Sequence, residues 1–300
     1  MDMDRQKPFN ATKNEQRVPP DHVPPELWDA HIHLFPEKLM RAIYRYFSEN
    51  YRWHLPFPAD TAALIKHLRE DGVKRAFVLA YVHKPGLSGQ VNRWLASVAA
   101  EQPWLVPFGA AHPEDPDLKS VLSEALDRHH FAGIKLHCLV QQISADDERL
   151  FPIYEALVKR SRALVIHATN FPLPDPKHLG MSRLAHVLKR FPTLLVAVAH
   201  LGLNELPLTR ELLQQYRGLY LDTAFVFQNN SCVPPHEEII RLMMDLPGRI
   251  LYGSDFPFIL EQPANGIQRI MRFNLPPLFY HKLFYQNASD FLRKINITSQ

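Results

Sequence analysis

Cysteine is almost missing from this 300-residue chain: Cys138 and Cys232 are the only two, and neither belongs to a CxxC motif. This scarcity argues against a disulfide scaffold and against a cysteine-rich zinc site. No apolar run approaches the roughly 20 residues of a membrane-spanning helix, and the first 26 residues lack the apolar stretch of a signal peptide. We therefore expect a cytoplasmic protein in which residues 1–26 form a flexible leader.

Clusters of positive charge are also missing. The formal net charge is only +3, and the 34 lysines and arginines are spread along the chain without basic runs. Nucleic-acid-binding and membrane-surface proteins usually carry such runs. We therefore expect a small-molecule substrate, with neither nucleic acid nor membrane as a partner.

What the chain does contain is a regular alternation of short apolar runs and amphipathic stretches. Several runs are almost continuously apolar, as buried parallel strands are. No GxGxxG or Walker-type loop follows any of them, which disfavours a doubly wound nucleotide-binding sheet. The predicted fold is an α/β (β/α)8 TIM barrel that forms a single domain over residues 27–300. Its expected strands are 27–33, 73–82, 105–112, 132–138, 163–169, 194–200, 218–224 and 249–255.

Ionisable residues gather at the carboxyl ends of these predicted strands. From Lys135 to His167 is 32 residues, and from His167 to His200 is 33, so each step matches one strand–helix unit. These side chains should therefore ring one mouth of the barrel, where barrel enzymes keep their active sites. The full set comprises His31, His33, Lys135, His137, His167, His200, Asp222 and Asp255.

Each member taken alone also has a structural interpretation. His167 could be a satisfied core histidine, and Asp255 could start a turn ahead of Pro257. We assign Asp222 a structural role at its strand end. The shared placement of so many ionisable residues nevertheless favours a functional set.

The pair His31 and His33 indicates a metal site. Residues i and i+2 of a strand point to the same side, so both imidazoles can reach one ion. Three imidazoles and one carboxylate suit Zn²⁺ or another divalent transition metal, with a coordination position left for water. We predict that one ion per chain binds to His31, His33, His167 and Asp255. His200 then becomes the acid–base partner of a metal-activated water.

Five segments resemble the signature segments of the amidohydrolase superfamily: "DAHIH", "GIKLH", "VIHAT", "VAHLG" and "LYGSDFPF". They are most similar to the amidohydrolase-related branch that includes aminocarboxymuconate-semialdehyde decarboxylase. The resemblance implies metal binding by the four predicted ligands, which are His31, His33, His167 and Asp255. It implies proton transfer by His200. It also implies that Asp255 accepts a proton from the metal-bound water, and a homodimer is the family expectation.

The reaction remains open between two classes. The first expectation is a metal-dependent hydrolase, in which activated water attacks a small anionic or aromatic amide, ester or lactone. The alternative is a metal-dependent decarboxylase of a small unsaturated or aromatic acid. In either case Lys135 and His137 would bind the substrate. A non-catalytic metal-binding barrel ranks lowest because His200 accompanies the ligands.

The number of metal ions is open as well. In binuclear members of the superfamily a strand-four lysine is carboxylated and bridges two ions, with histidines from strands five and six on the second ion. Lys135, His167 and His200 could fill this pattern. We nevertheless expect an unmodified Lys135 that pairs with an acidic neighbour or with an anionic substrate group.

Overall fold

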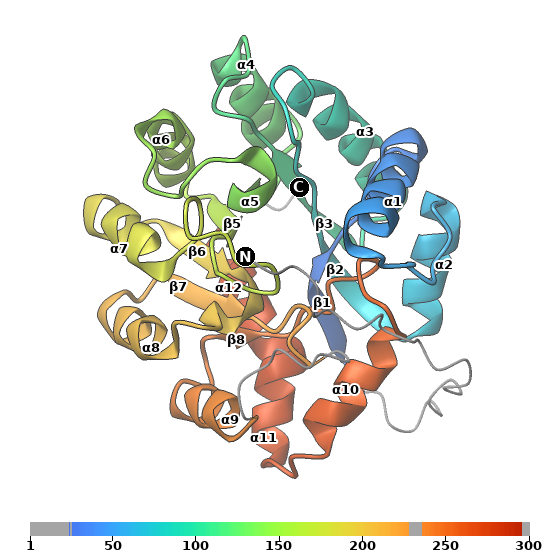
Figure 1. Cartoon of the computed structure of the whole chain (residues 1–300), viewed down its shortest axis with the longest axis vertical. Helices are drawn as coiled ribbons and strands as arrows, with labels where there is room; N and C mark the ends of the chain where they lie inside the picture. The colour runs from blue at the N-terminus through green and yellow to red at the C-terminus, as the bar shows by residue number, and fades with distance from the viewer. Residues whose placement is uncertain (1–23, 25, 228–235, 296–300) are drawn as a thin grey trace.

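The computed structural model describes residues 24, 26–227 and 236–295 and has eight parallel strands in one sheet, in the order of the sequence (Figure 1). The expected leader, apart from residues 24 and 26, lies outside the described residues, as does Cys232. The strands are β1 (Leu27–Ile32), β2 (Val73–Leu79), β3 (Leu105–Ala110), β4 (Gly133–His137), β5 (Ala163–His167), β6 (Leu195–Val198), β7 (Leu219–Asp222) and β8 (Ile250–Leu251). The prediction of a TIM barrel is confirmed.

Helices follow the strands and surround the barrel (Figure 1). Asp60 caps one of them as its sequence context indicates, since its side chain accepts a hydrogen bond from the amide of Ala63. No helix among the described residues is both long enough and apolar enough to cross a membrane. The helices are α1 (Glu37–Tyr51), α2 (Thr61–Glu70), α3 (Ser88–Glu101), α4 (Leu118–Ser123), α5 (Cys138–Gln141), α6 (Phe151–Lys159), α7 (Met181–Arg190), α8 (Leu206–Gln215), α9 (His236–Asp245), α10 (Pro263–Met271), α11 (Pro277–His281) and α12 (Asn287–Arg293).

The barrel closes between its first and last strands. The amide of Ala30 donates to the carbonyl of Tyr252 at 2.7 Å, and the amide of His33 donates to the carbonyl of Phe256 at 2.7 Å. The amide of Asp255 donates back to the carbonyl of His31 at 2.9 Å. This seam places the first strand beside the residues that follow the last strand.

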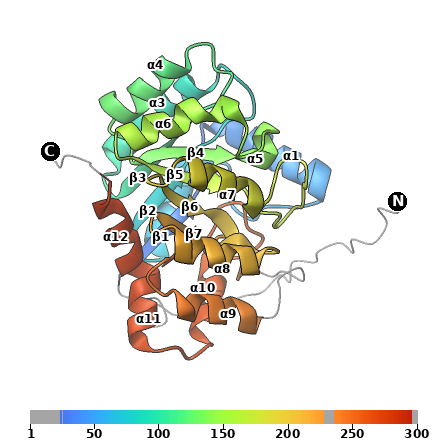
Figure 2. The ribbon, with the colours of Figure 1, turned by 90° about the vertical axis from the view of Figure 1, so that its left-hand side faces the viewer.

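The two ends of the barrel differ. Phe291 of α12 contacts Phe77 of β2 and Tyr220 of β7, with ring centroids 6.2 and 5.1 Å apart. Both partners lie inside the barrel, so α12 closes the end that faces away from the strand carboxyl termini. Figure 2 shows α12 on the opposite side of the barrel from α5, which follows β4 directly. The carboxyl end is therefore the one available for a site.

Several strands end earlier than the sequence predicts. β6 ends at Val198 where residues 194–200 were expected, and β8 covers only Ile250–Leu251 of the expected 249–255. For β6 the physical reason is local backbone geometry, because His200 adopts a left-handed conformation with φ of 62°. Beyond β8, Tyr252, Asp255 and Phe256 still hydrogen-bond to β1 or to His33 directly after it, but in an irregular pattern.

A close backbone approach makes one glycine of β4 essential for packing. A Cβ atom added to Gly133 would lie 1.8 Å from the carbonyl oxygen of Ala163 on β5. We expect Gly133→Ala to lower the free energy of unfolding by about 1–3 kcal/mol or more, because the backbone must shift. Gly248→Ala is the matched control, since nothing lies within 4 Å of its added Cβ. Equal denaturant midpoints for the two variants would contradict this account.

Candidate metal centre

Three predicted ligands converge at the barrel seam. His31 lies in β1, His33 follows that strand, and Asp255 follows β8. The Nε2 atoms of the two histidines are 3.2 Å apart. The Oδ1 atom of Asp255 lies 3.1 Å from His33 Nε2 and 3.4 Å from His31 Nε2. Among the described residues, this is the one group of three or more His, Cys, Asp or Glu whose ligand atoms all lie within 4.8 Å of one another.

The outer nitrogens of both histidines have acceptor partners. His31 Nδ1 is 2.7 Å from Asp222 Oδ2, and His33 Nδ1 is 2.8 Å from the carbonyl oxygen of Leu79. Carboxylate and carbonyl oxygens accept only, so each Nδ1 carries the hydrogen. In neutral imidazoles both Nε2 lone pairs then face each other and a carboxylate oxygen. This buried set of acceptors fits a divalent cation, and the outer hydrogen bonds are those that metal-bound histidines usually make.

His167 and His200 form a second pair beside this cluster. His200 Nδ1 is 2.7 Å from the carbonyl oxygen of Ala224, and His200 Nε2 is 3.1 Å from His167 Nδ1. By the same reasoning, His200 donates through Nδ1 and accepts from His167 through Nε2. His167 Nε2 is then an unprotonated nitrogen, and it is buried without a hydrogen-bond partner. Such an orphaned acceptor normally costs about 1–3 kcal/mol, so it too fits a metal ligand.

His167 nevertheless stands apart from the group of three. The 4.8 Å set contains His31, His33 and Asp255 only. The role of His167 as fourth ligand therefore stays a prediction. Burial lowers the pKa of His167 well below its usual value, and His137 lowers it further, so the ring is neutral as a ligand must be.

The two remaining predicted residues come from β4. The pair His137 and His167 is in register between β4 and β5, and the two rings stack at 4.2 Å. Lys135 is 1 % exposed, and its Nζ lies 3.3 Å from His31 Nε2. Burial lowers the pKa of Lys135 to about 8, although the charges of Asp222 and Asp255 oppose this shift. A positive charge therefore stands beside the acceptor cluster at neutral pH.

Asp222 has functional partners that the sequence did not reveal. Besides its bond to His31, its Oδ1 accepts hydrogen bonds from the amides of His200 and Ala224 at 3.2 and 3.0 Å. One carboxylate thus fixes the ring of a candidate ligand and the backbone of the candidate proton-transfer residue. The sequence signal that could have indicated these partners was the position of Asp222 at the end of β7, between the ends of β6 and β8.

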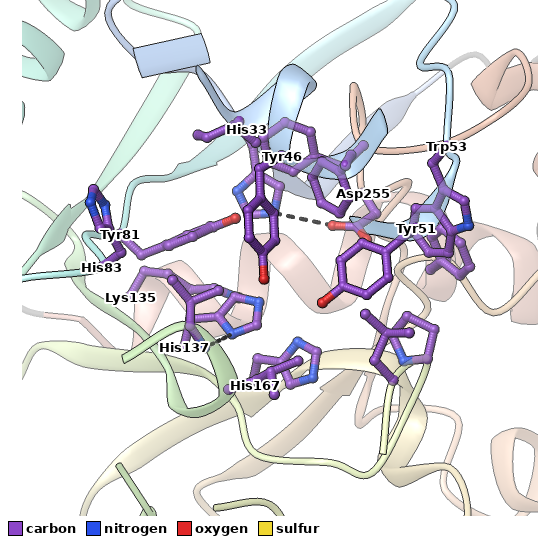
Figure 3. Close-up of a pocket in the computed structure, with 18 of the residues that line it drawn as sticks. His33, Tyr46, Tyr51, Trp53, Tyr81, His83, Lys135, His137, His167 and Asp255 are labelled. Carbon is purple, nitrogen blue, oxygen red and sulfur yellow. Dashed lines mark hydrogen bonds and ion pairs between the residues drawn. The ribbon is translucent and has the colours of Figure 1, made fainter. Parts of the chain in front are cut away.

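All seven residues predicted to carry function line one cavity of about 670 Å³ at the carboxyl end of the barrel (Figure 3). In this cavity Oδ1 of Asp255 faces the Nε2 atoms of both His31 and His33, where a metal ligand would need it. The seven are His31, His33, Lys135, His137, His167, His200 and Asp255.

Comparison with known proteins finds a matching family and a related decarboxylase. The model of a family described as "Amidohydrolase" matches residues 28–294. Decarboxylase yanB of Aspergillus niger is 24% identical over an alignment 306 residues long. The alignment covers 81% of this chain and 80% of that protein.

Solved structures share the fold. The 2,6-dihydroxybenzoate decarboxylase from Rhizobium matches with a TM-score of 0.66 at 16% identity, over 89% of this chain and 98% of that one. The 5-carboxyvanillate decarboxylase from Novosphingobium aromaticivorans, solved with manganese and a nitrobenzoic acid, matches with a TM-score of 0.62 at 16% identity, over 89% and 96% of the two chains.

The first test concerns the paired histidines. We expect the double variant His31→Ala/His33→Ala to lose bound metal, because it removes two of the three converging ligand atoms. Elemental analysis of protein equilibrated with Zn²⁺ or Mn²⁺ measures this directly. Full occupancy in a folded double variant would contradict the assignment.

The second test concerns Asp222. We expect Asp222→Asn to weaken metal affinity by about 10–100-fold, as loss of such outer hydrogen-bond partners usually does. Competition with a chromophoric chelator measures the affinity. Asp115→Asn is the matched control, since Asp115 is also buried and accepts backbone amides, those of Gly86 and His112. If both variants bind metal as tightly as the parent protein, Asp222 does not support the ligand set.

Proposed function

The chain belongs to the amidohydrolase family, and from this premise we propose that it is a metal-dependent decarboxylase of an aromatic acid. The acceptor cluster of His31, His33 and Asp255, with cationic Lys135 beside it in one cavity, is the observation that carries the proposal. Such a site can hold a carboxylate against positive charge. Decarboxylase yanB and the decarboxylases named for 2,6-dihydroxybenzoate and 5-carboxyvanillate support this choice over hydrolysis.

The proposed metal is a divalent ion on His31, His33 and Asp255, with His167 as the fourth ligand. Manganese in the 5-carboxyvanillate decarboxylase makes Mn²⁺ a candidate equal to the Zn²⁺ expected from the residues. When bound, the ion would supply positive charge that orients and polarises the oxygens of the substrate.

The chain's own residues would perform three tasks. Lys135, charged at neutral pH, would orient the substrate carboxylate. Decarboxylation breaks the bond between the ring carbon and the carboxyl carbon, releases CO₂, and requires one proton at that ring carbon. His200 lines the cavity together with the ligands, so we assign it the transfer of this proton, which its Nε2 would first take up from water in place of the hydrogen bond from His167. Aromatic side chains around the cavity would exclude water from the ring carbon.

Hydrolysis ranks second. The same cluster could activate water, and His200 could then move its proton. Its distinguishing product is an alcohol or amine released from an ester, lactone or amide, without any CO₂.

The decisive experiment loads the protein with Mn²⁺ or Zn²⁺ and supplies hydroxybenzoates in parallel with phenyl esters and lactones. We expect release of CO₂ and the matching decarboxylated arene, measured by chromatography. Ester or lactone cleavage without CO₂ would instead establish the hydrolase.

The role of His200 has its own prediction. General acid–base groups contribute about 10²–10⁴-fold to rate, so His200→Asn should lower kcat by that factor and retain the metal. His186→Asn is the control, because His186 lies on α7 with an exposed side chain that contacts Asp146. If His200→Asn loses metal as well as activity, His200 is a ligand and the assigned role is wrong.

A further inference from the structure

The cavity is much larger than one aromatic ring. A cavity of about 150 Å³ is enough to bind benzene, whereas this one measures about 670 Å³. Ligand pockets of about 300–1,000 Å³ typically enclose molecules of several rings. A single-ring acid at the acceptor cluster would therefore leave most of the space unused.

The extra space lies along α1. Leu39, Ile43 and Phe47 are spaced four residues apart and form one face of this helix. All three line the cavity, and all remain only partly buried, whereas Met40 is the one fully buried residue of α1. The apolar face of α1 is thus largely presented to the cavity, which leaves it available to a ligand.

Aromatic rings connect this face to the metal centre. The ring of His33 stacks on Phe258 at 4.9 Å, and Phe258 contacts Phe47 at 5.3 Å. Phe47 stacks on Trp53 at 5.6 Å with the planes 8° apart, and Trp53 stacks on Phe225 at 5.4 Å. We call Phe47, Trp53, Phe225 and Phe258 the aromatic wall. It runs from a candidate metal ligand toward Trp53, which Figure 3 shows on the opposite side of the cavity from Tyr81 and His83.

Charge is confined to the metal end. Among the described residues that line the cavity, Lys135 is the only lysine or arginine and Asp255 the only carboxylate. A neighbouring cavity of about 280 Å³ contains Arg149, but that guanidinium already pairs with Glu114 and Asp147. A second negative charge on a ligand, away from Lys135, would therefore be desolvated without a partner, which is costly.

We propose that the substrate carries a single carboxylate, held at the metal end, and an uncharged apolar body of at least one further ring that lies on the aromatic wall. The inference rests on the proposed function for the carboxylate end, and on the cavity alone for the apolar body. It makes Trp53 and Phe47 specificity-determining residues.

The test compares four probes on the metal-loaded protein by calorimetry: salicylate, 4-phenylsalicylate, 5-phenylsalicylate and 5-carboxysalicylate. Burying one more phenyl group should tighten binding about ten- to hundredfold relative to salicylate. The added carboxylate should weaken it. The phenyl derivatives should also quench tryptophan fluorescence, because Trp53 lines their subsite.

Substitutions in the aromatic wall test whether it forms the apolar subsite. Trp53→Ala should abolish the preference for phenyl-substituted acids and remove the quenching, and Phe47→Ala gives a second test if that variant does not fold. Trp94→Ala is the matched control, since Trp94 lies on α3 outside the cavity and should leave both signals intact. Equal affinity for salicylate and its phenyl derivatives, or tighter binding of 5-carboxysalicylate, would overturn the proposal.

Two results separate this inference from the proposed function. Tight, Trp53-dependent binding of phenyl acids without CO₂ release would support the apolar subsite and reject the decarboxylase. Release of CO₂ from single-ring acids with no preference for phenyl derivatives would support the decarboxylase and reject the apolar subsite. If Phe47→Ala changes the mass in light scattering but not the phenyl preference, the α1 face contacts a second copy and the proposal is wrong.

Discussion

Mutual repulsion among three buried acceptors is the constraint on which the centre depends. His31, His33 and Asp255 present two lone pairs and a carboxylate oxygen within 3.4 Å of one another. The fold makes this arrangement unavoidable, because Asp222 and the carbonyl of Leu79 take the only ring hydrogens of the two neutral histidines. Lys135 Nζ, 3.3 Å from His31 Nε2, offsets part of this repulsion, and a bound metal cation would relieve the rest. The outer partners would therefore contribute to the affinity for an ion together with the ligands themselves.

Backbone geometry completes the arrangement at the strand ends. His200, Leu201 and Asp255 all have positive φ, an uncommon conformation for residues other than glycine. Such strain is stable only where the surroundings fix it. Here the amide of His200 donates to Asp222 and the amide of Asp255 donates to His31. The site residues thus hold one another's backbones in place.

The sequence predicted the barrel and the gathering of the seven candidate site residues at one end of it, because one strand–helix unit has nearly constant length and buried parallel strands are continuously apolar. It could not predict where β6 ends, because the left-handed turn at His200 depends on Asp222, 22 residues away. It also missed the partners of Asp222, which come from β1 and from the end of β6. The cavity face of α1 was not recognised either, since an apolar helical stripe looks the same whether it meets a core or a ligand.

The seam between β1 and β8 has a consequence for how the protein is made. Its hydrogen bonds join His31, from the first strand, to Asp255, which follows the last strand. A ribosome adding about 5–20 residues per second releases the histidine pair many seconds before the carboxylate exists. During that interval the nascent chain would carry only half of the proposed metal site and could hold an ion only weakly. Tight metal retention would thus become possible only after synthesis has passed the last strand, so that capture of the ion would mark a completed barrel.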